Sequence, residues 1–248
     1  MNKILIVSTA AFLLFTTTVM AESKLMQLLS GAEFEPLVNE QGLFSANMGV
    51  TGAARGSAAV KFAQDYANGD QNFIDQYTVR FNDARVQAEQ ELKEQNFDLT
   101  DMGVAFAYAK VSLWQLGAGK LLSRSAVSNA LQFEINVFDA IKEQMPMDNN
   151  QRDIFHDLMM TYAVVYPYMV TLLTDNNSLE SAQTVKQIAT DEYLKLFQLP
   201  HAVAGYDSEG KYSLNEEKFI EWQKQVNTGS SQPSATSESD KPKLHSDW

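Results

Sequence analysis

The sequence predicts an all-α, single-domain helical bundle of about five to seven helices. Three observations support this fold class. Long segments repeat apolar residues at helical spacing, polar capping residues open several of these segments, and no run alternates like a strand of a large sheet. The bundle is expected over residues 58–226, between an irregular glycine-rich segment (22–57) and a disordered tail (227–248). The 248 residues include no cysteine, so the packed core alone has to stabilise this fold.

The first 21 residues have the three parts of a cleavable export signal. Lys3 supplies a positive charge, an apolar run extends from Ile4 to Phe15, and Val19 and Ala21 precede the expected cleavage site. The apolar run is shorter than the roughly 20 residues that span a bilayer. We therefore expect an exported protein, periplasmic or extracellular. Its mature chain should begin at Glu22 and contain no integral membrane span.

Two segments before the centre of the chain predict helices. A short helix is expected over Ser57–Ala67, because Asn68 and Gly69 follow as a stop signal. A longer one is expected from about Phe73 to Gln95, where apolar residues recur at helical spacing and the other faces are charged.

The next helix is expected to open at Asp98 as its N-cap and to run to about Leu116. It is apolar nearly all round, which is typical of a helix in the middle of a bundle or in a membrane. We favour the bundle, because the segment contains Lys110 and is short for a membrane span.

Three further long helices are expected in the second half: about Ser125–Met145, Asp148–Leu173 and Asn177–Phe197. Pro167 should kink the second of these. Residues 201–212 have the turn chemistry of a small hairpin. A last helix is expected from Ser213, with Glu216 completing a capping box. From residue 227 onward Ser, Pro, Thr and charged residues dominate, and this composition predicts disorder.

The net charge of −12 limits the partners of the protein. An acidic surface repels the phosphates of nucleic acids and anionic lipid headgroups. We therefore expect no nucleic-acid binding, whereas a basic partner protein would be attracted.

No catalytic or metal-binding motif is present. The histidines are His156, His201 and His245, and none has the spacing of a metal-ligand pair. His156, beside Asp153 and Asp157, is interpreted as part of an exposed helix face. No cofactor, metal site or catalytic residue is predicted.

One pair of charged residues stands out as a candidate polar site. Lys110 and Glu134 each lie in the middle of an apolar helical stripe, at nearly matching distances from the turn that joins their helices. In an antiparallel helical hairpin such positions lie side by side. Because a buried charge needs a partner, we expect the two to pair. The pair either fixes the packing or forms a polar ligand site; the remaining alternative is that Lys110 extends its charged end to solvent.

The stretch from Phe97 to about Tyr168 resembles an uncharacterised group of exported helical bacterial proteins, a domain of unknown function. The resemblance rests on two helix openings and on the helices that they begin: residues 96–101 before an alanine-rich and aromatic helix, and residues 148–152 before a helix rich in methionine and tyrosine. It implies export and a helical fold, and it assigns no activity and no site residues.

Three functions remain open on the sequence. The first is a non-enzymatic envelope protein that binds another protein, for example in a protective or immunity-type role. The second is a hydrolase that acts on an envelope polymer through surface carboxylates. The third is a carrier of an apolar ligand. The sequence does not decide whether the protein is an enzyme, and we prefer the non-enzymatic, protein-binding function.

Overall fold

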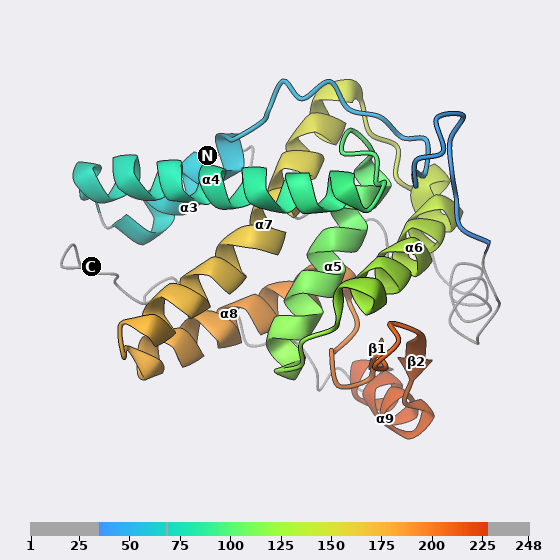
Figure 1. Ribbon diagram of the computed structural model, residues 1–248. Helices are drawn as coiled ribbons and strands as arrows, with labels where there is room; N and C mark the ends of the chain where they lie inside the picture. Colours follow the sequence, from blue (N-terminus) through green and yellow to red (C-terminus); the bar gives the residue numbers. More distant parts are fainter. Residues whose placement is uncertain (1–34, 68, 228–248) are drawn as a thin grey trace.

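The computed structural model describes residues 35–67 and 69–227 (Figure 1). These residues form seven α-helices, one 3-10 turn and one two-stranded sheet. In chain order they are α3 (Ser57–Ala67), α4 (Gln71–Glu94), α5 (Met102–Ala118), α6 (Arg124–Ile141), the 3-10 turn (Lys142–Gln144), α7 (Asn149–Asp175), α8 (Leu179–Phe197), β1 (Ala204–Tyr206), β2 (Tyr212–Leu214) and α9 (Glu216–Asn227). The predicted all-α bundle is confirmed. The predicted export signal, residues 22–34 and all of the predicted tail except Asn227 lie outside the described residues.

Helix α5 forms the centre of the bundle (Figure 1). It packs against α6, α7 and α8, and nearly every side chain from Met102 to Trp114 is buried. A helix that is apolar on all sides can be stable in water only if neighbours cover all of its sides, and here they do. Within the part of the chain that the structure describes, no helix is long and apolar enough to cross a membrane.

Helix α5 begins later than expected, because Asp101 and not Asp98 is its N-cap. The Asp101 carboxylate accepts a hydrogen bond from the backbone N–H of Gly103 at 2.7 Å. Asp98 instead accepts from Thr100 in a turn before the helix. The local sequence offers both aspartates as caps. Asp101, the aspartate that caps the helix, also accepts hydrogen bonds from Ser45 and Met48, which are distant in the sequence.

The other predicted helix starts have mixed outcomes. The capping box of Asp148 and Gln151 is present at the start of α7. The predicted start of α8 at Asn177 is wrong, because Asn177 has a left-handed φ of 57° and Ser178 takes the N-cap position. Ser213 does not open the last helix, because it pairs with Gly205 in the hairpin. The side chain of Asn215 caps α9 instead.

The predicted hairpin is present as the antiparallel strands β1 and β2. Two glycines let it approach the bundle closely. A Cβ on Gly205 would lie 2.5 Å from the indole of Trp114, and one on Gly210 would lie 1.9 Å from the carbonyl oxygen of Ala126. Neither position has room for a side chain, so the hairpin packs directly on α5 and α6.

Candidate functional site

Buried charge is concentrated in two places in the described structure. The hairpin network consists of Lys110, Glu134 and Tyr206, from α5, α6 and β1. The strap network lies where α4 and α7 meet the irregular segment before α3. Its members are Arg85, Glu89, Asp153, His156 and Asp157.

In the hairpin network, the structure brings the two predicted residues together. Lys110 Nζ lies 2.6 Å from Glu134 Oε2, and their side chains are 9% and 0% exposed. The other carboxylate oxygen, Oε1, accepts a hydrogen bond of 2.6 Å from the hydroxyl of Tyr206. Both oxygens of Glu134 therefore have a donor within the chain.

Tyr206, the third member of the hairpin network, carries no signal in the sequence that would predict its place there. Its ring packs edge-to-face on Trp114, with ring centroids 4.9 Å apart, and Trp114 Nε1 donates to the carbonyl of Ala204 at 3.0 Å. Burial and then the charge of Glu134 raise the pKa of Tyr206 well above its ordinary value. The phenol thus stays protonated and acts as a donor, and the network joins the hairpin to the centre of the bundle.

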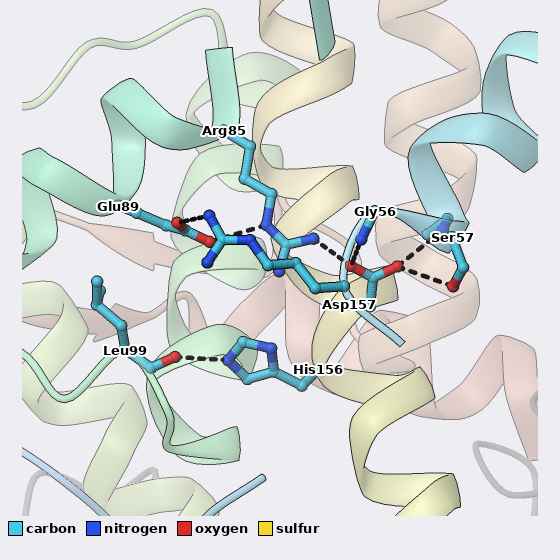
Figure 2. A network of polar contacts seen from close by, with 9 residues as sticks. Gly56, Ser57, Arg85, Glu89, Leu99, His156 and Asp157 are labelled. Carbon is cyan, nitrogen blue, oxygen red and sulfur yellow. Dashed lines mark hydrogen bonds and ion pairs between the residues drawn. The ribbon is translucent and has the colours of Figure 1, made fainter. Parts of the chain in front are cut away.

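The strap network is centred on Asp157 (Figure 2). Its carboxylate accepts from the backbone N–H of Gly56 and of Ala58, both at 2.7 Å, and from Ser57 Oγ at 3.1 Å. It also forms an ion pair with Arg85 Nη1. An aspartate of α7 thereby caps the start of α3, about a hundred residues earlier in the chain.

Arg85 connects Asp157 to a second carboxylate. It is 3% exposed, and its Nε lies 2.9 Å from Glu89 Oε1. The other oxygen of Glu89 lies 2.6 Å from Arg55, whose side chain is at the surface. Figure 2 shows Arg85 between the two carboxylates with which it forms ion pairs.

The interpretation of His156 as part of an exposed face is wrong. The side chain is buried, at 7% exposure, and Nε2 lies 2.9 Å from the carbonyl oxygen of Leu99 (Figure 2). A carbonyl only accepts, so Nε2 carries the hydrogen. Burial, followed by the nearby Arg85, lowers the pKa of His156 below its ordinary value of 6.5. His201 is half-buried before β1, and His245 lies outside the described residues.

Asp153 of the strap network and Asp101, a buried aspartate outside both networks, also bind the irregular segment. Asp153 accepts from the backbone N–H of Thr51 at 2.7 Å and of Gly52 and Ala53 at 3.2 Å, as well as from the Thr51 hydroxyl. The hydroxyl is the main cause that lowers the pKa of Asp153. Asp101 accepts from Ser45 Oγ and from the backbone N–H of Met48, both at 2.8 Å.

These contacts indicate what the buried charges do. Each buried carboxylate of the two networks is bound by donors of the chain itself, so these carboxylates join segments of the fold to one another. Within residues 35–67 and 69–227, no group of three or more His, Asp or Glu side chains is placed to hold a metal ion.

An open groove of about 640 Å³ lies between the end of α6 and the start of α7. Methionines and charged groups of both signs line it, among them Met48, Lys142, Glu143, Met147 and Arg152. Lys142 is already bound to Asp139 and to the carbonyl of Ala46. The charges of the groove therefore favour neither an anionic nor a cationic ligand.

Comparisons of the chain with protein-family models, with curated proteins and with solved structures gave no match. The resemblance over Phe97–Tyr168 stays a prediction.

The burial of His156 predicts a pH dependence of stability. The folded state favours the neutral ring, whereas the unfolded chain takes up a proton near the ordinary pKa of 6.5. The stabilising contribution is therefore complete above that pH and declines as the pH falls below it. His156→Gln keeps a donor for Leu99 but cannot be protonated. In urea unfolding at about pH 7.5 and about pH 5, it should lose less stability than the wild type.

His201 provides the control for this prediction, because burial also lowers its pKa. Its ring is only half-buried and lies outside both networks. His201→Gln should therefore change the pH dependence less than His156→Gln does. Equal losses in the wild type and in His156→Gln would contradict the prediction.

Proposed function

We propose that this chain is an exported, non-enzymatic helical protein of the bacterial envelope that binds another protein. The observation that carries the proposal is how the charge of the protein is divided between its interior and its surface. The buried charged groups are bound within the chain and account for only a small part of the net charge of −12, so most of the excess negative charge belongs to residues outside the buried set. Excess negative charge at the surface attracts basic surfaces and speeds encounter with them.

The outer face of α4 is the best candidate for this contact. The helix has 24 residues, which gives a length of about 36 Å. Asp75 and Asp83 are exposed on this face, whereas Glu91 is exposed further round the helix. Between them Val79 and Val86 are 59% and 52% exposed. Acidic groups beside apolar ones suit a partner with a basic rim and small apolar contacts.

The hydrolase alternative has less support. It requires two carboxylates that face an open cleft. Asp153 and Asp157 are near neighbours on α7, but backbone N–H groups of the segment above them occupy both. A protective or immunity-type role is one form of the protein-binding function.

A salt-dependent pull-down tests the proposed function. Residues 22–248 serve as bait for a bacterial envelope fraction at low and at high salt. A partner should be retained at low salt and released at high salt. Asp75→Lys with Asp83→Lys should abolish retention, whereas the same charge reversal on α9, Glu216→Lys with Glu217→Lys, should not. Retention that is unchanged by the α4 reversal, or no retained protein, would argue against the proposal.

Export makes a separate prediction. Since Val19 and Ala21 precede the expected cleavage site, N-terminal sequencing of the protein from the producing cell should start at Glu22. Membrane-bound protein that still carries Met1–Ala21 would contradict cleavage.

A further inference from the structure

We propose that residues 51–58, here called the strap, open as a unit while the bundle stays folded, and that Asp153 and Asp157 are the two groups that hold the strap closed. This inference is independent of the proposed function.

The strap is held mainly by hydrogen bonds to these two side chains. Its first three residues donate to Asp153, and its last three donate to Asp157. Between the two groups, Arg55 forms an ion pair with Glu89. Two further bonds close turns within the strap, from Arg55 to Gly52 and from Ser57 to Ala54, and its end continues into α3, where the carbonyl of Gly56 accepts from the backbone N–H of Val60.

Apolar packing contributes little to this attachment. All eight strap residues are described, and none of them is fully buried, since each is exposed or half-exposed. The neighbours differ: Val50 packs partly against the core, and Ala59 is 2% exposed. The buried apolar surface thus begins where the strap ends.

The balance of energies favours separate opening. Lifting the strap breaks few apolar contacts, because none of its own residues is fully buried, and water can hydrate both the freed amides and the freed carboxylates. Unfolding of α5 or α7, by contrast, exposes the centre of the bundle. Segments with few buried apolar contacts open at lower free energies than core helices do.

Opening would have two structural consequences. The first turn of α3 would lose its cap at Asp157, so α3 would fray from Ser57. The charged groups that the strap covers would become accessible to water. These are Asp157 on α7 and, on α4, Arg85 and Glu89, which pair with Asp157 and with Arg55 (Figure 2).

Hydrogen exchange of the folded full chain, followed by mass spectrometry near neutral pH, tests the proposal. In the wild type, amides 51–58 should exchange faster than those of α5 and α7. Asp153→Asn keeps the shape of the side chain but removes its charge, and bonds to a charged acceptor are the stronger ones. Exchange in the strap should then speed up about tenfold or more, and exchange in α5 and α7 should be unchanged.

Two further variants separate the strap from the rest of the fold. Thr51→Val removes a donor to Asp153 from the strap side, at an exposed position outside the packed core, and it should also speed strap exchange. Asp207→Asn is the matched control, because Asp207 likewise accepts from two backbone N–H groups, at 2.8 and 2.9 Å, but in the hairpin turn. It should leave strap exchange unchanged.

Three results would overturn the proposal. The first is strap exchange as slow as that of α5 in the wild type. The second is an unchanged strap rate in both Asp153→Asn and Thr51→Val. The third is equal acceleration of the strap, α5 and α7, which would mean that these contacts hold the whole fold. Trypsin gives a second readout, since cleavage after the exposed Arg55 should be faster in both variants while far-UV circular dichroism is retained.

Discussion

Lys110→Met is expected to lower the free energy of unfolding by about 3–5 kcal/mol. The substitution leaves Glu134, which is 0% exposed, with the Tyr206 hydroxyl as its remaining donor. Glu134→Leu should be comparably harmful, because the ammonium of Lys110 then stays buried without an anion. Urea unfolding of the single variants, followed by circular dichroism, measures both costs.

Removing both charges should cost much less than the two single costs added together, since no ion is then stranded. The remaining cost of the double variant has an identifiable source. The Tyr206 hydroxyl, which donates to Glu134 in the wild type, loses its acceptor, and such a loss typically costs about 1–3 kcal/mol. Adding Tyr206→Phe removes the unsatisfied group, so the triple variant should be more stable than the double.

Small and additive effects of Lys110→Met and Glu134→Leu would contradict the buried pairing, because they would mean that both side chains reach water. The cycle also bears on whether the pair is purely structural. If the triple variant folds well and still binds the partner of the wild type, the hairpin network serves packing alone.

Two of the three members of the hairpin network could be predicted from the sequence. Lys110 and Glu134 could be paired because two local patterns, an apolar stripe and the distance from a shared turn, have direct geometric meaning on a helical hairpin. Tyr206 follows Glu134 by 72 residues. No local pattern connects a strand residue to a helix residue over that separation, so the third member emerged only from the structure.

For Arg85 a usable signal was present. It lies between Phe81 and Ala88 at the same helical spacing that made Lys110 stand out. The same rule therefore predicts that it is buried. Its partner Asp157 was not predictable from the sequence. Polar residues on a helix are ordinarily exposed, whereas the buried face of α7 includes Asp153, His156 and Asp157.

The irregular segment explains why those aspartates are inside. Backbone N–H groups satisfy buried carboxylates as well as side-chain donors do, but they leave no trace in residue type. The glycines of the segment predicted turns, and they did not predict which side chains the turns would bind. The predicted helix starts at Asp98 and Ser213 are wrong because of contacts that the local sequence does not encode: Asp101 caps α5 while bound to Ser45 and Met48, and Ser213 pairs with Gly205 in the hairpin.

Arg85→Met should have the second large effect, again about 3–5 kcal/mol of lost stability. It leaves Asp157 without its ion pair and Glu89 with only the surface residue Arg55. Arg124→Met is the matched control. Arg124 pairs with Glu94 at 2.9 Å, but the two side chains are 62% and 51% exposed, and an exposed pair contributes about 1 kcal/mol or less.

The charge of Arg85 can be separated from its packing by a titration. Arg85 is the second cause, after burial, that lowers the pKa of His156, and Asp157 and Glu89 act in the opposite direction. Removing the guanidinium leaves both carboxylates beside the ring, so the pKa of His156 should rise. NMR of the folded variant, well below its unfolding midpoint, follows the imidazole proton directly. A large loss of stability with an unchanged pKa of His156 would mean that Arg85 acts through packing and not through its charge.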